Sequence, residues 1–222
     1  MNFIKPKPKK FYSVSPVFGK AAAVGGGAMA LDGGSTVTNG TGPTVVTLTT
    51  TGGSGTVVVG AVVSGSTTVA SVVGLGLTFT ASSANPVSVN ATDKAYLFTA
   101  PYTSNVSGSI TVTLVGTGYN VVSVMGISGT KTTAAIDGAA VGAVGSGPAI
   151  TTTNANDAVV AILEVSGVAA SPGAGWLASP GSDSTLYVFM EYRFASSIGT
   201  YTASMSAGTI LGGIITAIRQ GP

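Results

Sequence analysis

The sequence contains no cysteine and no histidine. Without cysteine the chain can form neither a disulfide nor a thiolate metal site, and without histidine it lacks the commonest general base and zinc ligand. No run of about eighteen apolar residues occurs, so we expect no membrane-spanning helix. The segment AAAVGGGAMA is interrupted by glycines and has no leucine-rich stretch, so we do not expect a secretory signal.

Charge is also scarce. Only 7% of the 222 residues are charged, against roughly a quarter in an ordinary soluble domain. Serine, threonine and the 33 glycines must cover much of the surface instead. Hydroxyl groups hydrate a surface without giving it net repulsion, so this surface is poorly protected against self-association. We therefore expect the chain to work as part of an assembly.

The few charges are unevenly distributed along the chain. Residues 1–20 contain five of the nine basic side chains and no acid, whereas the remainder carries four basic and seven acidic side chains. Pro6, Pro8 and Pro16 exclude a regular helix or a central strand from this segment. Glycines at 25–27 and 33–34 predict a flexible hinge. We interpret residues 1–35 as an extended basic anchoring arm and residues 36–222 as a folded domain.

Apolar side chains are interleaved with the lysines of this arm. A plain solvated tail or contact with nucleic-acid phosphates would account for the lysines alone. The aromatic and aliphatic residues between them favour an arm that inserts into a neighbouring protein while its lysines meet acidic surface. The residues predicted to bind the partner are Phe3, Ile4, Lys5, Lys7, Lys9, Lys10, Phe11, Tyr12 and Phe18.

Beyond the arm, short β-branched runs alternate with Gly, Ser, Asn and Pro, which is typical of an all-β sandwich. Long amphipathic helical periodicity is missing. Twelve strands exceed an immunoglobulin count and favour a jelly-roll-like antiparallel β-sandwich with an extended N-terminal arm. The predicted strands are 44–50, 56–63, 68–73, 77–82, 94–100, 109–115, 120–128, 149–153, 158–165, 185–194, 200–206 and 211–219.

Two of these runs, TVVVGAVV at 56–63 and AVVAILEV at 158–165, are apolar on both faces. Their second face must lie under a covering loop or against another subunit. The glycine- and alanine-rich stretch at 134–148 is predicted to be a loop.

The order of segments resembles a group of virion structural proteins of tailed bacteriophages. The resemblance lies in TVVVGAVVSG and TVASVVGLGLTFTAS, then KAYLFTAPYTSNVSGSITVTLVGTGYNVVSVMGISG, then GPAITTTNANDAVVAILEV, and covers about residues 45–219. The chain departs from that pattern at Gly74 and Phe79, where an acidic residue and a tryptophan are frequent. The resemblance implies a β-sandwich at the surface of a phage particle and implies no activity.

The acids that could carry chemistry occur singly: Asp32, Asp93, Asp137, Asp157, Glu164, Asp183 and Glu191. Asp157 is interpreted as closing a turn through backbone N–H groups, with a calcium ligand role beside Asn154 and Asn156 as the alternative. Asp93 and Lys94 are interpreted as a solvated turn, and Glu191 and Arg193 as members of cross-strand charge pairs. We predict no metal site and no cofactor.

Trp176, the only tryptophan, lies in the loop SPGAGWLASPGS. If its side chain is exposed, Trp176 would stack on a ligand or anchor an interface. If it packs beneath its own loop, its role is structural, and we favour this structural interpretation.

These observations predict a non-enzymatic virion protein attached through its arm, as a capsid decoration or minor capsid protein. Its expected partners are other virion proteins and copies of itself, not a small-molecule substrate, nucleic acid or a membrane. The alternatives are a tail, neck or fibre component, a carbohydrate-binding adhesin module that uses Trp176, and a hydrolase with a carboxylate pair.

Overall fold

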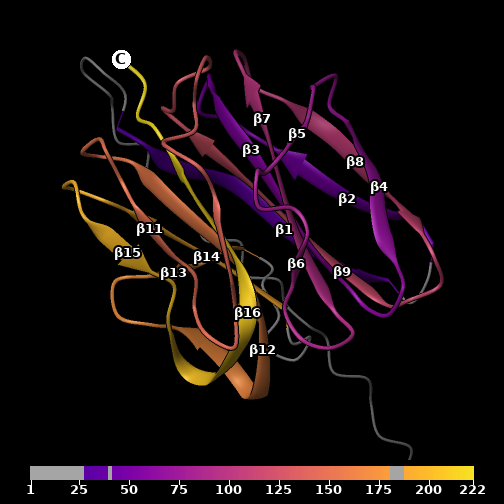
Figure 1. Ribbon diagram of the computed structural model, residues 1–222. Helices are drawn as coiled ribbons and strands as arrows, with labels where there is room; N and C mark the ends of the chain where they lie inside the picture. The colour runs from indigo at the N-terminus through magenta and orange to yellow at the C-terminus, as the bar shows by residue number, and fades with distance from the viewer. Residues whose placement is uncertain (1–27, 40–41, 181–187) are drawn as a thin grey trace, which may run out of the picture.

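The computed structural model describes residues 28–39, 42–180 and 188–222, and these residues form strands and no helix (Figure 1). They therefore include no helix that could cross a membrane. The strands of the N-terminal half are β1 (Ala30–Asn39), β2 (Thr44–Thr49), β3 (Gly55–Val63), β4 (Thr68–Gly74), β5 (Thr80–Ala81), β6 (Val87–Ser88), β7 (Lys94–Tyr102), β8 (Ser107–Val115) and β9 (Asn120–Ser128). Those of the C-terminal half are β10 (Val141–Val144), β11 (Ala149–Thr151), β12 (Ala158–Pro172), β13 (Leu177–Ala178), β14 (Val188–Phe194), β15 (Thr200–Thr202) and β16 (Met205–Ile218).

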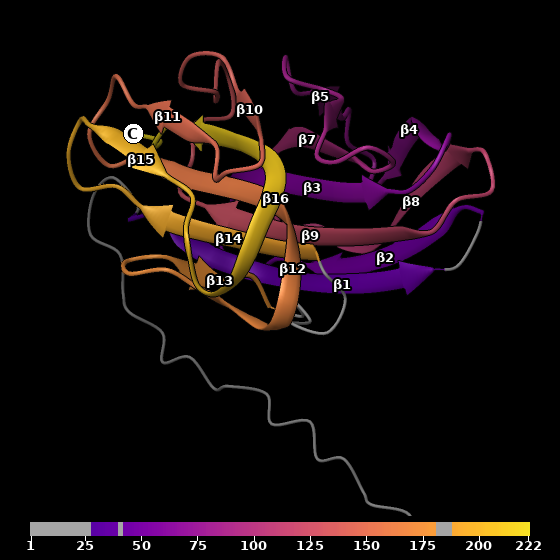
Figure 2. The ribbon, with the colours of Figure 1, turned by 60° about the horizontal axis from the view of Figure 1, so that its bottom comes forward.

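The strands pair antiparallel in four sheets. The largest has the order β1-β9-β3-β7-β5, with β6 also paired to β7, and we call it the central N-terminal sheet. An outer sheet, β2-β8-β4, accompanies it. The C-terminal half forms the sheet β10-β16-β12-β14-β13 and the short pair β11-β15. The two halves lie side by side in Figure 1 and Figure 2.

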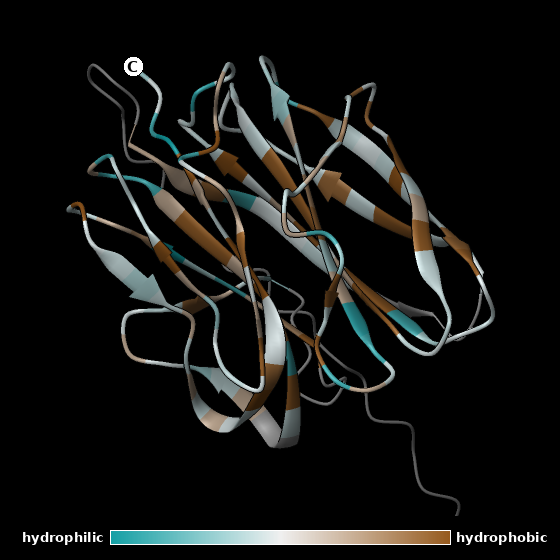
Figure 3. Cartoon of the chain, in the orientation of Figure 1, coloured by the Kyte–Doolittle hydropathy of each residue, from teal (hydrophilic) through white to brown (hydrophobic). Residues whose placement is uncertain are grey.

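Three apolar cores hold these sheets together. Alternate residues of β3 enter different cores: Val57 and Val59 pack with the outer sheet β2-β8-β4, whereas Val58 and Val62 pack toward β12, β14 and β16. The third core lies on the other side of β12 and contains Trp176. Figure 3 shows the hydrophobic residues concentrated on the strands, as expected when both faces of the inner sheets are covered.

Sheet stacking explains the two runs that are apolar on both faces. Every residue of β3 is buried within the chain, and so are the residues of β12 from Ala158 to Val165. A second sheet of the same chain covers β3, so neither a covering loop nor another subunit is required there. The subunit alternative is therefore not needed for either strand, and over β12 the segment that carries Trp176 forms part of the cover.

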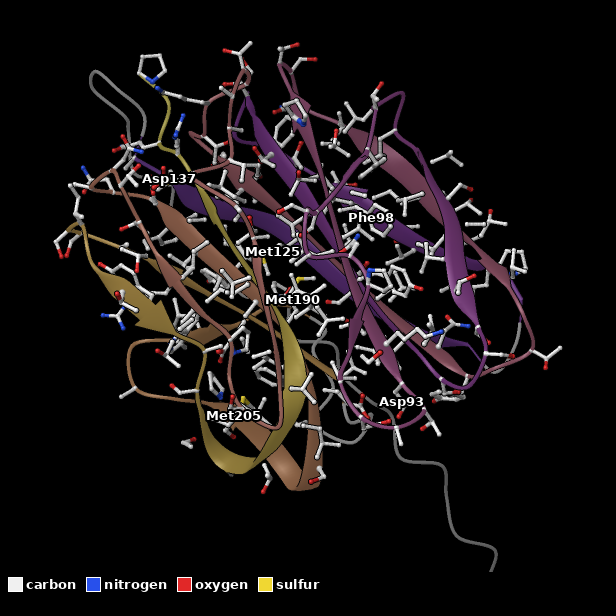
Figure 4. All side chains as sticks on the ribbon, in the orientation of Figure 1. Asp93, Phe98, Met125, Asp137, Met190 and Met205 are labelled. Carbon is white, nitrogen blue, oxygen red and sulfur yellow. The ribbon has the colours of Figure 1, made fainter. Side chains whose placement is uncertain are left out.

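Gly60 lies where β3 meets the C-terminal half. A Cβ atom at this position would lie 2.6 Å from Met190 Cε and 2.9 Å from two atoms of Ile162. Met190 and Met125 lie between the two halves in Figure 4, within the core that joins them. The glycine therefore allows β3 to pack directly against β12 and β14.

The all-β class with antiparallel sheets is confirmed, and a β-sandwich is consistent with it, whereas the jelly-roll arrangement stays a prediction. Strand 120–128 has the predicted bounds. The predicted loop 134–148 contains strand β10, which pairs with β16. The predicted arm also ended too late, because residues 30–35 pair with β9, and Gly33 and Gly34 lie at a bulge in β1 instead of in a hinge.

Candidate functional site

The predicted partner-binding residues of the arm, from Phe3 to Phe18, lie outside the described residues. Their role therefore stays a prediction. The first described strand begins at Ala30, at the edge of the central N-terminal sheet.

Trp176 is buried, with 5% of its surface exposed. Its indole Nε1 donates a hydrogen bond to the backbone oxygen of Thr202 at 3.1 Å, and its ring packs in the third core. An indole that is buried and hydrogen-bonded in this way is not available as a stacking platform for a sugar. This placement agrees with the structural interpretation and counts against the adhesin alternative.

The acids are the remaining candidates for chemistry, and folding buries most of them. Among the described residues, the buried acids are Asp32, Asp137, Asp157, Glu164 and Glu191. Asp93 is the described acid that keeps part of its surface in solvent. The acidic side chains of the described residues therefore lie mainly in the interior, in four separate places.

Asp32 has a structural role at the bulge of β1. Its carboxylate accepts hydrogen bonds from the backbone N–H groups of Thr51 and Gly52, at 2.7 and 2.9 Å. The hydroxyl of Tyr102 donates to the same carboxylate at 3.0 Å. Burial, followed by the charge and the hydrogen bond of Asp32, raises the pKa of Tyr102. Asp32 therefore joins β1 to β7 and to the turn between β2 and β3.

Asp137 and Asp157 form a buried carboxyl pair at one end of the molecule (Asp137 is labelled in Figure 4). Asp137 accepts hydrogen bonds from the backbone N–H and hydroxyl of Thr153, each at 2.5 Å, and forms a salt bridge with Arg219 at 3.2 Å. Burial by itself raises the pKa of Asp137, but the hydrogen bonds from Thr153, Asp157 and Arg219 hold it well below its usual range.

The same pair corrects the interpretation of Asp157. No backbone N–H donates to its carboxyl oxygens. Burial, together with the hydrogen bond and charge of Asp137, raises its pKa to about 7, so the protonated Asp157 faces an ionised Asp137. The turn-closing acid is Asp137, because Asn154 also donates to it through Nδ2 at 3.0 Å.

The calcium alternative at this turn gains no support from the contacts of Asn154, because its Nδ2 and backbone N–H both point to Asp137. The described residues contain no cluster of three or more acidic or other metal-binding side chains.

Glu191 is isolated in the third core. The strand register places Ala161 and Ala178 opposite it, so the predicted cross-strand charge pair does not form. Its Oε1 accepts a hydrogen bond from Ser204 N at 3.1 Å, and its Oε2 has no partner. Burial raises the pKa of Glu191 to about 8, against the lowering effect of that hydrogen bond. Arg193 instead lies over the ring of Tyr201, 5.1 Å from its centroid.

The fourth acidic group lies in a cavity of about 180 Å³ where the two halves meet, and we call this site the carboxyl cavity. Strand alternation explains why Glu164 lies there. Val160 and Ile162 of β12 face the core between the halves, and Glu164, two residues further along the same face, lies at the end of that core. Asp93 directly precedes β7 and lines the cavity from the N-terminal half. The cavity is lined by Val62, Val63, Ser64, Asp93, Tyr119, Val121, Glu164 and Val188.

Asn90 holds the two acids of the carboxyl cavity together. Its Nδ2 donates to Asp93 Oδ2 at 2.7 Å and to Glu164 Oε1 at 2.8 Å. Its Oδ1 accepts from the backbone N–H groups of Thr92 and Asp93, so the turn before β7 is rigid. Asp93 is therefore part of a fixed carboxyl pair, which the interpretation as a simple solvated turn did not foresee.

The electrostatics of the pair favour one negative charge. Burial, followed by the neighbouring carboxyl group of Asp93, raises the pKa of Glu164 to about 8, although the Asn90 hydrogen bond lowers it. Two carboxyls that share a site cannot both ionise easily. The pair therefore presents one charge near neutral pH, and Glu164 Oε2 has no hydrogen-bond partner.

A glycosidase needs its two carboxyls about 5–9.5 Å apart, so that a sugar or a water fits between them. In the carboxyl cavity, Asp93 Oδ2 and Glu164 Oε1 both accept a hydrogen bond from Asn90 Nδ2. The Asn90 amide therefore lies between these two acids, where a glycosidase needs room for the sugar or the water. The arrangement in the carboxyl cavity suits binding of a cationic donor better than hydrolysis of a glycoside.

No protein-family model, no curated protein and no solved structure matches this chain.

Proposed function

We propose that this chain is a non-enzymatic structural protein of a tailed-phage virion. In this proposal, the residues that precede β1 attach it to the particle, and the β-sheets form a rigid body on the particle surface. We place it as a capsid decoration or minor capsid protein before a neck, tail or fibre component. Its partners are then other virion proteins and further copies of the chain.

The uncharged outer sheet β2-β8-β4 is the observation that carries this proposal. Its three strands contain no charged residue. Val45, Val73 and Val115 of this sheet are among the exposed large apolar residues. Lysines and other charges on edge strands normally prevent association between sheets, and β2 and β4 are edge strands without them. Such a sheet suits a protein that packs against neighbours in an assembly.

Deleting residues 1–27 from the phage-encoded chain tests the attachment. The deletion stops before β1, so pairing of β1 with β9 is kept. We expect the shortened chain to fold, as judged by circular dichroism, and to be missing from purified particles. A matched control replaces Lys131 with Gln, which changes a charge outside the arm. Normal incorporation of the shortened chain would contradict the proposal.

A further inference from the structure

The carboxyl cavity contains an acidic group that lacks a partner. Glu164 is 7% exposed, its Oε1 is bound by Asn90, and its Oε2 has no hydrogen-bond partner although the side chain lines the cavity. A buried carboxyl oxygen without a donor is costly. A donor group that enters the cavity would remove that cost, so the site is built for a ligand with N–H or O–H groups.

The walls of the cavity restrict the chemistry of that ligand. Val62, Val121 and Val188 are all buried apolar side chains, and they line the cavity beside the acids. Tyr119 lines it as well and is 46% exposed. A ligand that fills this space needs an apolar stem behind its polar head, and an aromatic ring favours a cation beside it.

A divalent metal ion fits the site poorly. Calcium takes six to eight oxygen ligands, and magnesium takes six. Here the Asn90 amide presents N–H groups to both acids, and its oxygen is already bound by Thr92 and Asp93. An alkylammonium group carries three N–H donors and an apolar stem, and therefore matches both the acids and the valines.

Charge complementarity identifies the source of such a group within this chain. Residues 1–20 carry five lysines and no acid. Among the described acids, Asp93 is the one that is not buried. The carboxyl cavity is therefore the place where the described surface offers an accessible acid to the basic residues of another copy. A lysine side chain has the four-carbon stem and the ammonium head that the cavity requires.

We propose that the carboxyl cavity binds the ammonium group of a lysine side chain from residues 1–20 of another copy of the chain. This inference rests on the proposed function, because it gives the basic arm a receptor on a neighbouring subunit.

Binding replaces the proton of Glu164 by an ammonium ion, so Glu164 is ionised in the complex. Affinity therefore rises with pH up to about 8, where Glu164 ionises without a ligand. Asp93 and Tyr119 are the other titratable side chains that line the cavity.

The test uses full-length protein and n-butylammonium as a probe. One variant has Lys5, Lys7, Lys9, Lys10 and Lys20 all replaced by Gln, so that its own lysines do not compete. We expect calorimetry to detect n-butylammonium binding to this variant, and affinity to fall about fourfold for each methylene removed from the probe. Glu164→Gln in the same background should weaken binding at least about tenfold, because it removes a charge-assisted hydrogen bond. Glu191→Gln, which alters a buried acid outside the cavity, is the matched control and should leave the affinity for n-butylammonium unchanged.

Comparison with the wild-type chain tests whether the natural ligand of the cavity is a lysine from residues 1–20. Its lysines compete with the probe, so n-butylammonium should bind it more weakly than it binds the glutamine variant. Sedimentation velocity should show wild-type self-association that Glu164→Gln or excess n-butylammonium reverses. Equal probe affinity for the two chains, absence of binding, or calcium binding in place of the amine would overturn the inference.

Failure of this inference can be told apart from failure of the proposed function. Suppose that deleting residues 1–27 abolishes incorporation into particles while Glu164→Gln leaves it normal. The arm then anchors elsewhere, and only the inference about the cavity is wrong.

Discussion

Glu191 makes a sharp prediction about how stability depends on pH. Burial raises its pKa from 4.5 to about 8, because its side chain is fully buried and meets no opposite charge. The folded state therefore holds a proton that the unfolded state releases above pH 4.5. The resulting stabilisation is complete below about pH 4.5 and is lost as pH rises through 8.

The magnitude follows from the size of the shift. One pKa unit corresponds to about 1.4 kcal/mol, so Glu191 contributes up to about 5 kcal/mol of pH-dependent free energy. Glu191→Gln removes the titration but keeps an oxygen that can accept from Ser204 N. The other buried acids titrate equally in both chains and cancel in the comparison. Between pH 5 and 7.5, wild type should lose about 3 kcal/mol of unfolding free energy relative to the variant.

Urea unfolding at a series of pH values, followed by the fluorescence of Trp176, measures this difference. Repeating the series in 1 M salt is the control: burial is not screened by salt, so the difference should persist. Parallel stability curves for the two chains from pH 5 to 9 would refute the reasoning, because Glu191 would then be ionised in the folded protein.

Two further predictions concern packing and hydrogen bonding. Gly60→Val should lower the free energy of unfolding by about 1–3 kcal/mol, because the new side chain overlaps Met190 and Ile162. The control is Gly199→Val, where the nearest atom to a new Cβ lies 3.9 Å away, and it should change the free energy of unfolding by less than about 0.5 kcal/mol. A loss at Gly60 no larger than at Gly199 would contradict the close packing of β3 against Met190 and Ile162. Asp32→Ala should cost about 2–5 kcal/mol in urea unfolding, because Thr51, Gly52 and Tyr102 lose their acceptor. Tyr102→Phe removes one of those bonds and should cost about 1 kcal/mol, so equal losses in the two variants would contradict the role assigned to Asp32.

The sequence alone was a good guide to where strands form. Alternation and turn residues are local properties, and they located β2, β3, β7, β8 and β9 closely. The same rules missed β10, since its glycines and alanines have weak β propensity and pairing with β16 decides their conformation. They also ended the arm too late, because the bulge at Gly33 and Gly34 looks like a hinge when read locally.

Part of the candidate site could have been anticipated from one signal. Glu164 stands in an otherwise apolar run, and a lone acid in a buried strand needs a partner. Its partner could not be identified, because Asn90 and Asp93 lie far away in the sequence, in a turn of the other half.

By itself, the sequence determined that this chain is built of strands, that its surface is poor in charge and that its basic residues gather near the start. Only the tertiary structure decided which faces are covered and which acids meet. Strand periodicity is set by neighbours along the chain, whereas the stacking of β3 against β12 and the pairing of Asp93 with Glu164 depend on how distant segments pack.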